Sequence, residues 1–178
     1  MTREKETIVK VGNPVLRQKA QEVKPADIKS PKIKKIIETM SETLRKTEDG
    51  VGIAAPQIGV PLRIFIASEE AKYTESNPKK CEKKDKNSWK HYIFINPEII
   101  KTSQNKIESQ EGCLSVPGLI GLVPRAEKVK IEALDEKGKK IKLGTSKLFA
   151  RLMQHEMDHL EGVLFVDRSE KVIKIEHE

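Results

Sequence analysis

Residues 147–161 read KLFARLMQHEMDHLE, and Gly162 follows. Apolar residues recur through this stretch at helical spacing, and glycine commonly follows the last turn of a helix, so the sequence predicts a helix over 147–161. On that helix His155 and His159 lie one turn apart on the same face, where two imidazoles can bind one metal ion. Glu156 stands beside them as a carboxylate that can shuttle protons. We therefore expect a central helix that carries a metal site.

A third protein ligand is needed, because catalytic metal sites usually combine three protein ligands with one water molecule. The extended H-E-x-x-H-x-x-G-x-x-H pattern fails here, since Phe165 occupies the place of the third histidine. The remaining histidines are His91 and His177, and His177 lies next to the C-terminus. Cys113, in the segment EGCLSVPG at 111–118, offers a thiolate, which is a strong metal ligand. A free cysteine is most often a buried structural thiol, but beside a helix that lacks a third ligand we expect Cys113 to bind the metal.

The pattern elsewhere predicts one more helix and several short strands. Ser30 followed by Pro31 is typical of a helix start, and isoleucines and a leucine follow at helical spacing before Gly50 ends the helix. Turns rather than helices join most of the strands, which favours an α+β fold of mostly antiparallel sheets packed around the central helix. The expected strands are Leu62–Ala67, His91–Asn96 ended by Pro97, Lys128–Leu134, Lys139–Leu143 after a turn at Asp135–Gly138, and the short Val163–Val166 and Val172–Ile175.

The chain has 178 residues and a formal net charge of +7, and this length suits one catalytic domain over residues 1–178. No stretch approaches the roughly 18 continuous apolar residues of a membrane helix. The N-terminal MTREKETIVK also lacks the apolar core of a signal peptide. Cys81 and Cys113 are the only cysteines, which suits a reducing compartment and a metal or catalytic role before a disulfide. We expect a cytoplasmic protein with no membrane or DNA partner.

Much of the positive charge lies in residues 72–90, here called the Lys-rich segment, which read KYTESNPKKCEKKDKNSWK and hold seven lysines and three acidic residues. The composition predicts a long surface loop inserted between two strands. Such a loop can simply be solvated, and the abundance of Lys-rich loops favours this interpretation. It can instead contact RNA such as that of the ribosome, although Tyr73 and Trp89 alone do not make a platform for stacking bases.

A third notable stretch, residues 50–59, reads GVGIAAPQIG. Gly50 and Gly52 allow another chain to approach the backbone closely, and Gln57 carries an amide that can donate to an oxygen. Judged alone, the stretch is a glycine turn followed by a solvent-facing glutamine. It lacks the Lys-Ser/Thr pair of a phosphate-binding loop, so nucleotide binding is not supported.

Three motifs in this order resemble those of the peptide deformylase family. Residues 50–57, GVGIAAPQ, fit G-x-G-x-A-A-x-Q; residues 111–115 read EGCLS; and residues 154–159, QHEMDH, fit Q-H-E-x-D-H. The similarity extends to GNPVLR at 12–17 and to LVPRAEKVKI at 122–131. The resemblance therefore covers nearly the whole chain outside the Lys-rich segment, and three ordered motifs are far more specific than two histidines on a helix.

The resemblance implies roles for the matching residues. The implied metal ligands, with water in the fourth place, are Cys113, His155 and His159. Glu156 would act as general acid and base, and the Gln57 side chain and the backbone N–H of Leu114 would stabilise the oxyanion. Glu111 is expected to pair with Arg125 behind the ligands. The expected substrate-binding residues are Val51, Gly52 and Gly112 along the peptide backbone, and Leu148 and Leu152, which share the helical face of His155, along the methionine side chain.

The activity implied by the resemblance is removal of the N-formyl group from the starting methionine of newly made proteins, with release of formate. One divalent metal ion is expected, Fe²⁺ in the cell, with Zn²⁺, Ni²⁺ or Co²⁺ able to occupy the site. The alternative enzyme is a zinc metallo-endopeptidase of the H-E-x-x-H type, which requires a third His or Glu ligand downstream. An RNA-binding module without chemistry would leave the three motifs unexplained. Many relatives end in a basic helix, whereas this chain ends in KVIKIEHE, so we expect ribosome contact through the Lys-rich segment.

Overall fold

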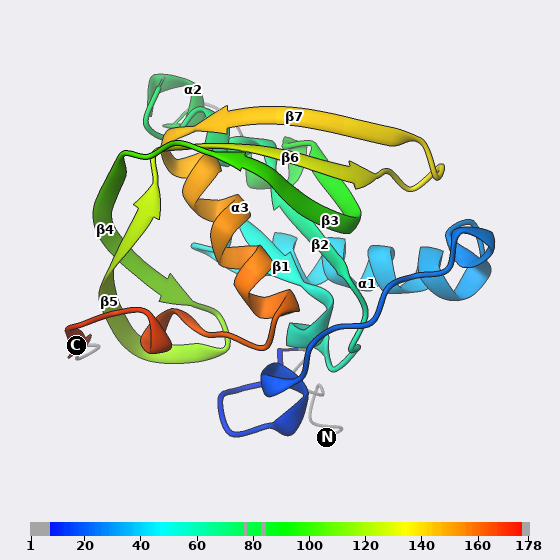
Figure 1. Ribbon diagram of the computed structural model, residues 1–178, viewed down its shortest axis with the longest axis horizontal. Helices are drawn as coiled ribbons and strands as arrows, with labels where there is room; N and C mark the ends of the chain where they lie inside the picture. Colours follow the sequence, from blue (N-terminus) through cyan, green and yellow to red (C-terminus); the bar gives the residue numbers. More distant parts are fainter. Residues whose placement is uncertain (1–7, 77, 83–84, 176–178) are drawn as a thin grey trace.

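The computed structural model describes residues 8–76, 78–82 and 85–175. Helix α3 (Lys147–Leu160) lies in the middle, with a five-stranded sheet on one side of it and the hairpin of a three-stranded sheet on the other (Figure 1). All strand pairs of the two sheets are antiparallel, which confirms the expected α+β class. No helix in these ranges is long and apolar enough to cross a membrane.

The five-stranded sheet has the order β1-β2-β3-β6-β7. Its central strands are apolar towards α3, and the rings of Phe65 and Phe94 stack there with centroids 4.6 Å apart. Alternation of buried and exposed residues along Lys128–Leu134 is that of a half-exposed strand, as predicted. The strand bounds are β1 (Gly52–Ala54), β2 (Ile64–Ser68), β3 (His91–Thr102), β6 (Lys128–Leu134) and β7 (Lys140–Ser146).

The three-stranded sheet has the order β4-β5-β8 and was largely missed by the sequence pattern. Its strands are β4 (Lys106–Cys113), β5 (Val116–Ala126) and β8 (Val172–Lys174). The first two form a hairpin in which Glu111 pairs with Gly121, and a register shift at its end places Cys113 opposite Val116. The tight end of this hairpin therefore presents Cys113 towards the central helix.

Helix α1 (Pro31–Lys46) begins where predicted, because the Ser30 side chain accepts a hydrogen bond from the Ile33 N–H. It ends earlier than Gly50, the predicted end. Thr47 is already extended, and its hydroxyl donates to the carbonyl of Leu44 at 2.8 Å. Thr47 thus caps the last turn of α1, and the residues from Thr47 to Gly50 belong to the loop that connects α1 to β1.

Two strand predictions were wrong. Pro97 does not end β3, because a register shift between Ile95 and Glu98 accommodates the residue that lacks an N–H, and the strand continues. The predicted strand at Val163–Val166 is replaced by the short 3₁₀ helix η6 (Phe165–Asp167). The other 3₁₀ helices are η1 (Pro14–Arg17), η2 (Pro25–Asp27), η3 (Ala55–Ile58), η4 (Glu69–Lys72) and η5 (Lys86–Ser88).

The Lys-rich segment is more structured than the predicted loop. It contains the short helix α2 (Pro78–Glu82) and η5. Trp89 is only 2% exposed and stacks on Tyr73 with ring centroids 5.6 Å apart, so it anchors the segment to the protein. The Lys72 ammonium lies 3.8 Å from the centre of the Tyr92 ring. Because Trp89 is buried, it is not available for stacking on bases.

Candidate metal centre

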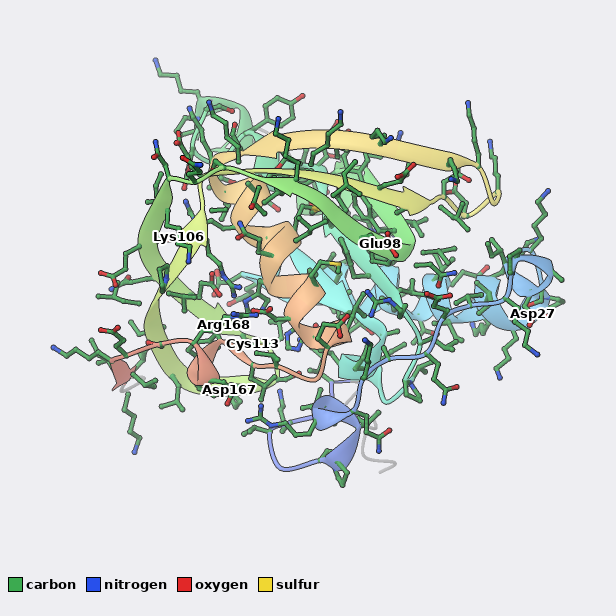
Figure 2. The ribbon with its side chains drawn as sticks, viewed as in Figure 1. Asp27, Glu98, Lys106, Cys113, Asp167 and Arg168 are labelled. Atoms are coloured by element: carbon green, nitrogen blue, oxygen red, sulfur yellow. The ribbon has the colours of Figure 1, made fainter. Side chains whose placement is uncertain are left out.

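The three sequence motifs meet beside α3. The first supplies β1 and η3, the second forms the end of the β4–β5 hairpin, and the third lies on α3 itself. Cys113, labelled in Figure 2, lies next to this helix, with its Sγ 3.2 Å from Nε2 of His159. Residues distant in sequence are therefore brought together by the packing of both sheets against one helix.

Cys113, His155 and His159 form a group that could hold a metal ion. One ligand atom from each lies within 4.8 Å of the others, and the two imidazole centroids are 5.0 Å apart. Burial lowers the pKa of His159 well below its usual value, which favours the neutral imidazole that binds metals. Two imidazoles and one thiolate are a donor set of catalytic metal sites that leave one position open. The donor chemistry therefore fits a divalent transition metal.

The ring of His155 is oriented by Glu111. His155 Nδ1 lies 2.9 Å from a Glu111 carboxylate oxygen, and this leaves Nε2 for a metal. Arg125 donates two hydrogen bonds to the same carboxylate, at 2.7 and 2.8 Å. Burial alone would raise the pKa of Glu111, but the hydrogen bonds from Arg125 and His155 lower it to about 2. The expected Glu111–Arg125 pair is confirmed, and it keeps a negative charge behind the ligand.

A second acidic residue extends this network. Arg125 also donates to Oδ2 of Asp158 at 2.6 Å, and Arg168 (labelled in Figure 2) donates to Oδ2 at 2.5 Å and to Oδ1 at 2.6 Å. Asp158 and Arg168 were not among the predicted site residues. Asp158 stands within the QHEMDH motif, three residues after His155, and its fixed place in the Q-H-E-x-D-H pattern was the available signal.

Glu156 is buried, and its Oε2 has no hydrogen-bond partner among the described residues. Burial raises the pKa of Glu156 to about 7, and this effect outweighs the charge of His155, which lowers it. A carboxylate that is free to accept or donate a proton near neutral pH is what general acid–base catalysis requires.

Gln57 is buried. The stretch 50–59 judged alone predicted that it faces solvent, and that prediction was wrong. Its Oε1 accepts a hydrogen bond from the Ala54 N–H at 2.8 Å, which fixes the orientation of the amide. Its Nε2 donates to the Ser115 hydroxyl at 3.2 Å and lies 3.6 Å from Sγ of Cys113. The side chain therefore directs N–H groups towards the metal-binding cysteine.

A cavity of about 440 Å³ opens beside these groups. It is lined by the ligand His155 and by Glu156 and Gln57. Arg151 and Ile175 also line it and were not foreseen. The other expected site residues that line the cavity are Val51, Gly52, Gly112, Cys113, Leu114, Leu148 and Leu152.

Two sheet edges border this cavity. β1 is the first strand of one sheet and β4 the first strand of the other, so each has one unpaired edge within its sheet. Val51 and Gly52 line the cavity at one edge, and Gly112 lines it at the other. An extended peptide can pair with such edges through its own backbone.

Comparisons with known proteins agree with the motifs. The chain matches the family model described as polypeptide deformylase over residues 5–174. It is 41% identical over 162 residues to the chloroplastic peptide deformylase 1A of Solanum lycopersicum, and the match covers 90% of this chain but 58% of the tomato protein. It is 42% identical over 171 residues to the peptide deformylase of Halothermothrix orenii, with 96% of each covered. A structure of the class I type b peptide deformylase from Acinetobacter baumannii bound to Met-Ala-Ser aligns with a TM-score of 0.76 and 33% identity, over 90% of this chain and 96% of that one.

Proposed function

The chain belongs to the polypeptide deformylase family, and on this basis we propose that it hydrolyses the N-formyl group of peptides that begin with formyl-methionine. The products are formate and a peptide with a free N-terminal amine. The observation that carries the proposal is the Cys113–His155–His159 group, of which Cys113 and His155 line the same cavity as Glu156 and Gln57.

The metal would be held by Cys113, His155 and His159. When bound there, a divalent cation supplies a Lewis acid and lowers the pKa of water to near neutral. We propose Fe²⁺ as the ion used in the cell, with Zn²⁺, Ni²⁺ or Co²⁺ able to replace it, because imidazole and thiolate donors suit all of these ions. Glu111 supports this role, since its contact with Nδ1 of His155 keeps the other ring nitrogen available.

Glu156 is the proposed general acid and base. It takes a proton from the water that attacks the formyl carbon, and it returns a proton to the amine nitrogen as the carbon–nitrogen bond breaks. Glu156 lines the cavity, and its buried Oε2 has no hydrogen-bond partner among the described residues, which supports this role.

The negative charge that develops on the formyl oxygen would be stabilised by the Nε2 amide of Gln57 and the backbone N–H of Leu114. The substrate backbone would pair with Val51, Gly52 and Gly112 at the two sheet edges. The Met side chain would pack against two leucines of α3. These are Leu148 and Leu152, both of which line the cavity.

The test is formate release from formyl-Met-Ala-Ser, with protein purified without oxygen and loaded with Fe²⁺. The peptide is chosen because the Acinetobacter baumannii relative binds Met-Ala-Ser. Acetyl-Met-Ala-Ser is the control, since its extra methyl group crowds the site of attack. Formate from the formyl peptide alone supports the proposal. Cleavage of an internal peptide bond, detected by mass spectrometry, would instead assign the chain to the endopeptidases.

We also propose a transient ribosome contact through the Lys-rich segment. The positive charge of the segment supports this contact. Lys72 is left out of the test because its ammonium already contacts the Tyr92 ring. Replacement of five lysines of the segment by serine, with Lys72 and Lys90 kept, should weaken cosedimentation with ribosomes at low salt. The replaced lysines are 79, 80, 83, 84 and 86, and a control variant replaces the exposed Lys24, Lys29, Lys32, Lys34 and Lys35. Equal binding of the two variants would refute this contact.

The proposed compartment is the cytoplasm. Cys81 and Cys113 are both free thiols, as a reducing compartment allows. The tomato relative is named as chloroplastic, so a fluorescent fusion of the full chain in its own cells is the direct test.

A further inference from the structure

The segment Val9–Val11, here called the N-terminal strap, connects the two halves of the cavity wall. The Val9 N–H donates to the carbonyl of Gln57 at 2.7 Å. Two residues later, the Val11 N–H donates to the carbonyl of Ser115, also at 2.7 Å. The strap thus bonds at one end to η3, which follows β1 of the five-stranded sheet, and at its other end to the β4–β5 turn of the three-stranded sheet.

Lys10, between these two contacts, adds a side-chain bond. Its ammonium donates to the carbonyl of Leu114 at 3.2 Å. The N–H of the same peptide unit, which belongs to Ser115, lies 3.4 Å from Sγ of Cys113. The Leu114–Ser115 peptide unit is therefore held from both sides, and this fixes the backbone of Leu114 where it lines the cavity.

The two proposed oxyanion donors lie next to strands of different sheets. Gln57 lies on η3 after β1, and Leu114 lies in the β4–β5 turn. Gln57 also bonds directly to Ser115, but it uses the same amide nitrogen that would serve the oxyanion. When that nitrogen turns to the substrate, the bonds of the strap still hold the two donors in register.

We propose that the N-terminal strap is a positioning element for the oxyanion donors, with Lys10 as the positioning residue for Leu114. This inference rests on the proposed function. Because the donors act on charge that develops only in the transition state, loosening the strap should lower kcat and leave KM nearly unchanged. Misplacement of a catalytic group by about 1 Å can cost on the order of a hundredfold in rate.

The first test compares Lys10→Met with Lys10→Arg in the full, metal-loaded chain. We expect kcat to fall about three- to tenfold in the methionine variant, because one of several bonds to the turn is lost, and to recover in the arginine variant, which keeps a donor. Lys29→Met, on an exposed lysine away from the strap, is the control. A rise in KM with unchanged kcat would overturn the assignment.

The second test removes a backbone donor. Val11→Pro deletes the N–H that reaches Ser115, whereas Val11→Ala keeps it and trims a side chain that is 49% exposed. We expect kcat to fall tenfold or more in the proline variant and to stay within twofold of wild type in the alanine variant.

Hydrogen exchange supplies a readout that does not depend on activity. In Val11→Pro the amides of residues 112–116 should exchange faster, while those of α3 keep their wild-type rates. Unchanged exchange at 112–116 in Val11→Pro, together with unchanged kcat in Lys10→Met and Val11→Pro, would overturn the proposal. If the wild-type chain releases no formate, the proposed function fails, but the exchange rates still decide whether the strap holds this turn.

Discussion

Gly52 leaves room for the proposed general base. A Cβ at this position would lie 2.5 Å from Oε1 of Glu156 and 2.6 Å from Cδ1 of Leu152. Gly52→Ala should therefore displace the carboxylate and lower kcat/KM at least tenfold. The matched control is Gly144→Ala in β7, where an added Cβ would meet nothing within 4 Å. Steady-state kinetics on the formyl peptide give the comparison, and equal rates for the two variants would contradict this account.

Glu156 itself is tested by a substitution that keeps its shape. Glu156→Gln removes the group that transfers protons, so kcat should fall about 10²- to 10⁴-fold. The ligands are untouched, so metal content measured on the same sample should stay at that of the wild type. Glu136→Gln, in the exposed turn between β6 and β7, is the control. A Glu156→Gln enzyme with a near-normal rate would remove this residue from the mechanism.

At the scale of elements, Arg125 joins the β4–β5 hairpin to α3. It pairs with Glu111 of β4 and Asp158 of α3, and all three side chains are at most 10% exposed. Arg125→Met should lower the free energy of unfolding by about 3–5 kcal/mol, because Glu111 is left buried without its partner. Arg168→Met should cost about 1 kcal/mol or less, since Arg168 is 46% exposed and Asp158 keeps Arg125.

Urea unfolding of the metal-free variants measures both effects. The metal is removed for this comparison because ligand binding would add its own contribution to stability. Similar midpoints for Arg125→Met and Arg168→Met would mean that the buried network does not hold the hairpin to the helix.

Elements with a strong local pattern were predictable from the sequence. The start of α1 follows from Ser30 and Pro31, and β6 follows from strict alternation of buried and exposed residues. β5 was not predicted, because Pro117 and its glycines weaken the strand pattern and the pairing with β4 decides its structure. The continuation of β3 past Pro97 also depends on a bulge against β6, which no local rule contains.

The same distinction applies to the site. Spacing on one helix was enough to propose His155 and His159, and the lack of a third ligand on that helix led to Cys113, which the family motifs then supported. The contacts of Asp158 with Arg125 and Arg168, and those of Lys10 with Leu114, join residues far apart in the sequence. Such contacts are set by the packing of whole elements, so a single sequence did not indicate them.

For the whole molecule, metal binding should couple to stability. The three ligands come from the hairpin and from α3, so an ion bound there would hold these elements together. Metal at a hundredfold excess over its Kd adds about 2.7 kcal/mol, which for a chain of this size raises Tm by about 5–10 °C. A chelator should lower Tm by this amount in calorimetry and have no effect on Cys113→Ser. An equal chelator effect in that variant would place the metal elsewhere.

Hydrolysis of formyl-Met-Ala-Ser in water enriched in ¹⁸O distinguishes deformylation from cleavage of a peptide bond. Attack of water on the formyl carbon predicts formate that carries one ¹⁸O from solvent and a Met-Ala-Ser product that carries none. An endopeptidase would put ¹⁸O into the carboxylate of a shorter peptide fragment and release no formate. Labelled formate with an intact, unlabelled peptide is the predicted result, and labelled fragments without formate would contradict it.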